Sequence, residues 1–122
     1  GYAGVALDIL EAVNSTTTKR IVVSIQNNGT LDFLRPDDVI EISCDLSREG
    51  LKPVTPVKVP TAQKNMISCV KEYERLAVAA ILQQDKSLAV RALMAHPLIG
   101  SWSLAKTLVE AYLDDEQFAA WR

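Results

Sequence analysis

Few side chains in this sequence are of a type that does chemistry, and most of those have an ordinary structural explanation. The single histidine, His96, stands at the expected end of a helix, where an imidazole most often caps carbonyl groups. Cys44 and Cys69 lie far apart without a CxxC pairing, which is typical of buried, reduced thiols. Neither cysteine shares a chelating spacing with the histidine. The neighbouring Asp37 and Asp38 follow a proline in a loop, where turn and capping roles are the rule.

Two further features stand out against this background. Asn27-Asn28-Gly29 lies where an apolar strand opens into a long loop, and its simplest explanation is a turn in which Gly29 takes a positive φ. Tyr2 stands just before an amphipathic helix, and taken alone it would be an exposed residue at a cut end.

Composition narrows the functional classes. The 122 residues suit one domain. Because 48% of them are apolar, a tight core or a partner surface must cover their side chains. A net charge of −2 provides no basic field for nucleic acid. No apolar run approaches the roughly 20 residues of a membrane span. Unpaired cysteines favour a cytoplasmic protein.

The elements that must position these residues begin with a helix that ends near Asn14. Its predicted buried stripe consists of Val5, Ala6, Ile9, Leu10 and Val13. A β-branched run at 19–26 predicts a strand, and apolar residues on both of its faces favour an interior position. A second strand at 39–46 alternates more cleanly, with Ile40, Ile42, Cys44 and Leu46 on one face. The proline-punctuated segment 50–60 predicts an edge strand or an extended wall.

The rest of the chain is predicted to be helical. Thr61 is the expected N-cap of a long helix that reaches about Gln84, with a stripe of Met66, Val70, Tyr73, Ala77, Ala80 and Ile81. Further helices are expected at 85–96 and from Ser101 or Ser103 onward, with a last turn or two in the tail. This order predicts an α+β fold, a small antiparallel sheet of two to three strands covered by about four to five helices. No internal domain boundary is visible.

Taken in order, three segments resemble a known family. They are GYAGVALDILEAV, IVVSIQNNGTLDFLRPDDVIEISCDL and VKEYERLAVAAILQQDKSLAVRALMAHPLIGSWSLAKTLVEAYL. Together they are similar to the C-terminal part of the NAD-dependent family 4 glycoside hydrolases, and most similar to the 6-phospho-β-glucosidases. The resemblance spans nearly the whole chain and implies part of a lactate/malate dehydrogenase-like C-terminal domain.

The resemblance implies a longer enzyme whose N-terminal Rossmann domain holds NAD and a divalent metal, usually manganese. In that family the cofactor oxidises the sugar at C3, a base removes the C2 proton, and the aglycone leaves by elimination; water then adds and the hydride returns. These enzymes depart from two-carboxylate hydrolysis. Residues 1–122 are therefore expected to be a single C-terminal domain fragment that binds neither NAD nor metal and is inactive alone.

The resemblance also assigns candidate site residues. Tyr2 matches the family tyrosine that is the proposed C2 base, and the metal is the cation expected to lower its pKa. Asn28 is a weaker candidate, in a loop that could line the sugar pocket. The family's metal-binding cysteine and histidine lie upstream of this region, so Cys44, Cys69 and His96 are not matched to them.

The expected partner is a phosphorylated disaccharide or aryl glucoside, with no nucleic acid and no membrane, and a homo-oligomer is expected. Two alternatives stay open. The parent is another member of the same family, such as a 6-phospho-α-glucosidase or an α-galacturonidase, or the chain is a non-catalytic binding or oligomerisation module.

Overall fold

A computed structural model describes residues 2–55 and 58–121, with Tyr2 represented by its backbone alone. The chain forms two compact units, residues 1–58 (unit 1) and residues 59–122 (unit 2). This division is not predicted from the sequence, where the prolines between 53 and 60 indicate only an extended segment. Among the described residues, one three-stranded antiparallel sheet and four α-helices confirm the expected α+β fold class.

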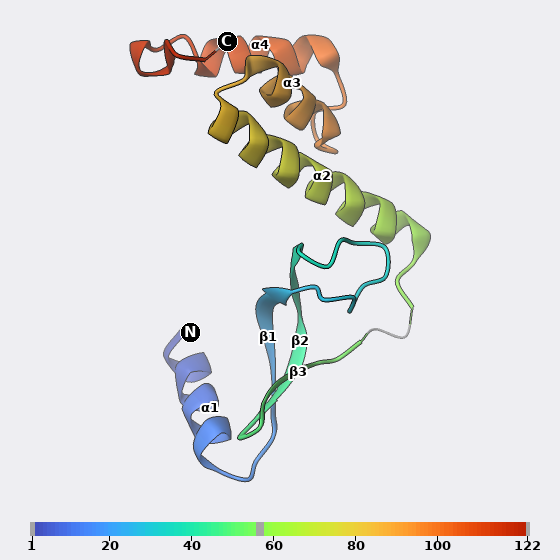
Figure 1. Cartoon of the computed structure of the whole chain (residues 1–122). Coiled ribbons are helices and arrows are strands. Elements are labelled where there is room, and N and C mark those ends of the chain that lie inside the picture. Colours follow the sequence, from blue (N-terminus) through green and yellow to red (C-terminus); the bar gives the residue numbers. More distant parts are fainter. Residues whose placement is uncertain (1, 56–57, 122) are drawn as a thin grey trace. The chain divides into compact units, whose positions relative to one another are not determined.

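Unit 1 is built on an antiparallel sheet (Figure 1). Its strands are β1 (Lys19–Gln26), β2 (Val39–Ser47) and β3 (Gly50–Pro53), in the order β1-β2-β3. The register places Ile21 opposite Cys44 and Gln26 opposite Val39. The predicted edge position of the third strand is confirmed, and Pro53 ends it where a ladder N–H is not required.

One face of β2 supplies most of the core of unit 1. Ile40, Cys44 and Leu46 are buried, as their alternation predicts. The expectation that residues 19–26 form an interior strand is wrong, because among the described strands β1 pairs with β2 alone and lies at the sheet edge. The apolar side chain that suggested a second buried face, Val22, is 61% exposed.

Helix α1 (Tyr2–Asn14) packs against β1 and β2. Ala12 is fully buried, whereas four members of the predicted stripe are exposed: Val5, Ala6, Leu10 and Val13. Apolar side chains surround most of this helix, so the sequence pattern did not identify which side faces the sheet.

A charged side chain at the start of β1 ties the helix to the sheet. The Lys19 ammonium lies 3.0 Å from the Glu11 carboxylate and 3.4 Å from that of Asp8. Glu11, more than Asp8, raises the pKa of Lys19 above its ordinary value.

Unit 2 contains α2 (Thr61–Gln83), α3 (Lys86–Ala95), α4 (Trp102–Tyr112) and a short 3-10 turn, η1 (Glu116–Phe118). The prediction that Thr61 caps α2 is wrong. Pro60, with φ −60° and ψ 147°, occupies the N-cap position without a side-chain hydrogen bond, and Thr61 is the first helical residue. The two following helices begin where the sequence predicts and have side-chain caps. Asp85 accepts a hydrogen bond from the Leu88 N–H, and Ser101, one of the two predicted starts, accepts one from the Leu104 N–H.

The helices of unit 2 pack in chain order, α2 on α3 and α3 on α4. Val90, Ala105 and Val109 form the centre of their core. Ala80 and Ala92 are also buried, but Met66 and Ile81 of the predicted α2 stripe are each more than 60% exposed. The stripe assignment for α2 is therefore only partly correct.

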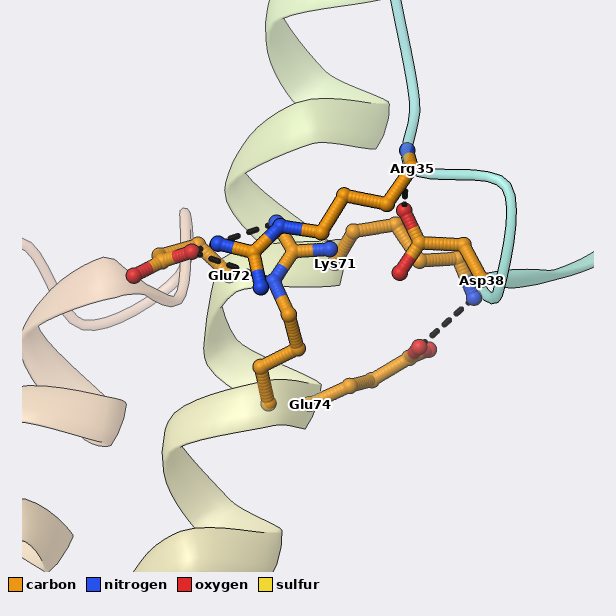
Figure 2. Close-up of polar contacts among 6 residues, drawn as sticks. Arg35, Asp38, Lys71, Glu72 and Glu74 are labelled. Carbon is orange, nitrogen blue, oxygen red and sulfur yellow. Dashed lines mark hydrogen bonds and ion pairs between the residues drawn. The ribbon is translucent and has the colours of Figure 1, made fainter. Parts of the chain in front are cut away.

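The middle of α2 carries charged pairs one turn apart, drawn in Figure 2. The Lys71 ammonium lies 2.6 Å from the Glu74 carboxylate, and the Arg75 guanidinium lies 3.1 Å from that of Glu72. Pairs at this spacing stabilise an isolated helix by about 0.2–0.5 kcal/mol each.

Candidate functional site

The candidate site is the loop of residues 27–38 that joins β1 to β2 in unit 1. Its two ends are held together by backbone hydrogen bonds. The Asn27 N–H donates to the Asp38 carbonyl at 2.7 Å, and the Asn28 N–H donates to the Pro36 carbonyl at 2.9 Å. These bonds continue the ladder beyond the last strand pair, Gln26 and Val39. The segment is thus a compact loop with closed ends, of a kind that is frequently functional.

The side chain of Asn27 is fully buried and occupies the inside of this loop. Its Nδ2 donates to the carbonyl of Leu31 at 3.0 Å and to that of Arg35 at 3.1 Å, with a longer contact of 3.4 Å to Leu34. Its Oδ1 accepts from the Leu31 N–H at 2.8 Å. Each hydrogen-bonding group of the amide therefore has a partner, as a buried amide requires.

The residues after Asn27 form a tight turn. Asn28 and Gly29 have φ values of 43° and 84°, and the Thr30 N–H donates to the Asn27 carbonyl at 2.8 Å. Two successive positive φ values closed by such a bond are the pattern of a type I′ turn, which favours Asn-Gly. The predicted positive φ at Gly29 is confirmed. The turn leaves Asn28 exposed at the loop surface.

The far end of the loop is held by a carboxylate. Asp38 is buried, and its Oδ2 accepts a hydrogen bond from the Arg35 N–H at 2.9 Å (Figure 2). This contact gives Asp38 the turn-stabilising role that the sequence predicts for it. Asp37, beside it, is exposed.

Helix α1 runs antiparallel to β1, because the short connection 15–18 reverses the chain between them. The N-terminal end of α1 and the 27–38 loop consequently lie toward the same end of unit 1 (Figure 1). The side chain of Tyr2, the candidate base, lies outside the described part of the structure. The fold therefore places the start of α1, which carries Tyr2, and the loop that carries Asn28 toward the same end of unit 1.

The other reactive side chains have structural roles or surface positions. His96 is the C-cap residue of α3, but its ring does not cap a carbonyl as predicted; Nδ1 accepts from the Leu98 N–H at 3.2 Å. The ring also lies edge-on to Tyr73, with centroids 4.8 Å apart. Both cysteines are free, and the expectation of burial is correct for Cys44 but wrong for Cys69, which is exposed on α2.

Sequence reasoning identified the loop but gave the wrong importance to its first residue. The pattern Asn27-Asn28-Gly29 predicts an ordinary turn, whereas Asn27 is the buried centre of the loop. A usable signal was present: an asparagine directly after an apolar strand is well placed to bond the backbone of the loop that follows.

Residues 2–99 match the family model described as the family 4 glycosyl hydrolase C-terminal domain, and this chain belongs to that family. The resemblance seen in the sequence is thereby confirmed.

Among curated proteins, the chain is 32% identical over 113 residues to the 6-phospho-beta-glucosidase BglT of Thermotoga maritima. That match covers 93% of this chain and 27% of the relative. A probable 6-phospho-beta-glucosidase of Bacillus subtilis is 24% identical, and the phospho-alpha-glucosidase PagL of Clostridium acetobutylicum is 23% identical, each over 113 residues. The chain spans about a quarter of the length of these relatives.

Solved structures give the same picture. The Thermotoga maritima 6-phospho-beta glucosidase with manganese, NAD+ and glucose-6-phosphate superposes with a TM-score of 0.77 at 31% identity, over 95% of this chain and 29% of that one. A 6-phospho-alpha-glucosidase from gut microorganisms, in complex with NAD and Mn2+, superposes with a TM-score of 0.80 at 20% identity. This second match covers 99% of this chain and 28% of that one, and it shows the shared fold.

The residues described here do not fit a metal or NAD site of their own. Residues 2–55 and 58–121 contain no group of three or more His, Cys, Asp or Glu side chains placed to hold a metal ion. The sequence also lacks a GxGxxG phosphate-binding segment. In the described part of the chain, no helix is long and apolar enough to cross a membrane.

Proposed function

We propose that this chain is the C-terminal, pocket-lining part of a 6-phospho-β-glucosidase that uses NAD and a divalent metal to cleave phosphorylated β-glucosides. The observation that carries the proposal is the 32% identity to a 6-phospho-beta-glucosidase across 93% of the chain, within the matched family. Because the match covers 93% of this chain but only 27% of that relative, the groups that hold NAD and metal would come from residues outside this chain. The chain by itself is expected to be inactive.

Tyr2 is the candidate general base for the C2 proton of the sugar. A phenol has an ordinary pKa of about 10, so this role requires a nearby cation that favours the phenolate. Support comes from the position of Tyr2 as the first residue of α1, at the end of unit 1 that also carries the 27–38 loop.

Asn28 is the candidate sugar contact on this loop. Its exposed carboxamide has two donor hydrogens and an acceptor oxygen, which suit sugar hydroxyls that donate and accept at once. Its left-handed backbone, with φ 43°, holds it at the tip of a defined turn.

The test is an assay of the full-length protein that contains this chain, on nitrophenyl 6-phospho-β-glucoside, with and without NAD and Mn2+. Hydrolysis that requires both additions is the expected result. Tyr2→Phe should reduce kcat by at least about a hundredfold, the lower end of the contribution of a general base. Unchanged turnover in Tyr2→Phe would remove Tyr2 from the mechanism, and absence of hydrolysis in the unsubstituted protein would reject the activity.

A 6-phospho-α-glucosidase is the second candidate. Several relatives with this activity are 21–24% identical to the chain, and the fold matches an α-specific enzyme with a TM-score of 0.80. Running the same assay with nitrophenyl 6-phospho-α-glucoside separates the two, because preference for this anomer would select the second candidate. A non-catalytic module is selected if neither anomer is cleaved.

We also propose that the protein is a homo-oligomer. The apolar residues Leu7 and Leu10 of α1 and Val78, Ile81 and Leu82 of α2 are all more than half exposed, which leaves apolar surface to be covered. Gel filtration with light scattering tests this; a clean monomer at high concentration counts against it.

The cytoplasm is the proposed compartment. Cys44 and Cys69 are both free thiols, and thiols are kept reduced there. Recovery of the protein in the cytoplasmic fraction of its host cells is the expected result, and recovery from the medium would contradict it.

A further inference from the structure

We propose that Asn27 is a positioning residue for the sugar pocket: its buried amide holds the 27–38 loop in the shape that presents Asn28 to the substrate. This inference rests on the proposed function, because it gives Asn28 a sugar to contact. Asn27 itself is fully buried and therefore acts through its neighbour.

The loop depends on this amide because it has no regular secondary structure over residues 27–38. Its interior backbone groups must find partners outside a helix or ladder. The Asn27 side chain supplies them on both sides of the loop, to Leu31 at one point and to Arg35 at another. One side chain thereby links the first and second halves of the loop.

The amide is coupled to Asn28 through the main chain. The backbone of Asn27 is held by two hydrogen bonds, from its N–H to the Asp38 carbonyl and from the Thr30 N–H to its own carbonyl. The peptide that joins Asn27 to Asn28 is thus held at its carbonyl by the Thr30 N–H and at its own N–H by the Pro36 carbonyl. Asn28 in turn takes the left-handed backbone that its position in the type I′ turn requires.

A substitution at Asn27 can remove the donor group of the carboxamide and keep its acceptor oxygen. Asn27→Asp has nearly the same shape and keeps an oxygen for the Leu31 N–H, but it faces a second oxygen toward the carbonyls of Leu31 and Arg35. Those contacts become repulsive or cost a buried proton. The loop should then open without loss of volume in the core.

The experiment is a double-mutant cycle in the full-length enzyme, with Asn28→Gly as the second change. Glycine removes the side chain of residue 28 and accepts its positive φ without strain. Each single variant should raise KM for nitrophenyl 6-phospho-β-glucoside about tenfold. The double variant should have the KM of Asn28→Gly alone, because Asn27 acts through Asn28.

Val109→Ala is the control for simple destabilisation. It removes two methyl groups from the core of unit 2 and should lower the unfolding temperature without a change in KM. If Asn27→Asp multiplies KM by the same factor in both backgrounds, or leaves KM unchanged, the inference is overturned. If Asn28→Gly leaves KM unchanged while Asn27→Asp raises it, the inference also fails, although the proposed activity stands.

A second measurement does not depend on activity. In Asn27→Ala, the Leu31 amide loses its acceptor and should exchange its hydrogen at least about ten times faster, whereas the Cys44 amide in β2 should not change. If the Leu31 backbone N–H keeps its protection from exchange, the Asn27 side chain does not hold the loop, and the inference is overturned. If the substrate assay fails but this exchange increases, only the proposed function is rejected.

Discussion

Arg20 and Asp45 face each other across β1 and β2 and form a paired contact with two hydrogen bonds. The Arg20 Nε lies 2.8 Å from Asp45 Oδ1, and one terminal nitrogen lies 3.0 Å from Oδ2. The two residues are direct partners in the strand register. The hydrogen bond from Arg20 is the main cause of a pKa for Asp45 below its usual range, and Asp45 raises the pKa of Arg20 in return.

This pair predicts a pH-dependent contribution to stability. Because the pKa of Asp45 is lower in the folded state, the stabilisation is full above its unfolded value of 3.8 and is lost as the pH falls through the folded value. Asp45→Asn should therefore unfold at a lower temperature than the unsubstituted protein at pH 7. The difference should shrink well below pH 3.8. Thermal melts by circular dichroism at pH 7 and well below pH 3.8 measure the difference in unfolding temperature. A difference that is the same at both pH values would contradict a stabilising Arg20–Asp45 pair.

Alanine substitutions at two glycines should change the free energy of unfolding in opposite directions. At Gly29 the backbone has φ 84°, so Gly29→Ala should cost about 1–2 kcal/mol although no atom obstructs a Cβ there. Gly4 lies within α1 and is equally open, so Gly4→Ala should stabilise by about 1 kcal/mol. Urea denaturation gives both values. The turn assignment fails if the two variants shift the midpoint in the same direction.

The N-cap of α3 predicts a local loss of stability. Asp85→Ala removes the acceptor of the Leu88 N–H, a bond of 3.0 Å, and should cost about 1 kcal/mol. Ser87→Ala is the matched control, since Ser87 is exposed inside the same helix and caps nothing. Equal effects in the two variants, measured by urea denaturation, would show that the cap contributes nothing.

Two valines in unit 2 allow the loss of stability on truncation to be compared between a core position and a surface position. Val90→Ala should cost about 1.6 kcal/mol, from two buried methylene equivalents at roughly 0.8 kcal/mol each. Val78 is 56% exposed, so Val78→Ala should change stability by less than about 0.5 kcal/mol in the monomeric chain. Denaturation at low protein concentration makes the comparison. A large loss at Val78 under those conditions would mean that its face is covered within the chain.

Local sequence rules predicted most of the element positions. The strands at 19–26 and 39–46 and the capped starts of α3 and α4 follow from side-chain alternation and from Asp85 and Ser101, whose effects act over a few residues. The prediction failed where Thr61 was assigned the cap of α2, because Pro60 already has the extended backbone that the position requires.

The candidate site was only partly visible in the sequence. The glycine of the Asn-Asn-Gly turn identifies a positive φ from residue type alone. The role of Asn27 depends on carbonyls four and eight residues away, and only the folded loop brings these within 3.1 Å of one side chain.

By itself, the sequence determined the family, the α+β class and the alternating face of β2, since these follow from residue order and from periodicities that need no distant partner. Tertiary structure alone decided that β1 lies at the sheet edge, which side of α1 faces the sheet, and that Asn27 rather than Asn28 is buried. The physical reason is that burial is a relation between segments. An apolar or polar side chain carries no record of the surface that will cover it.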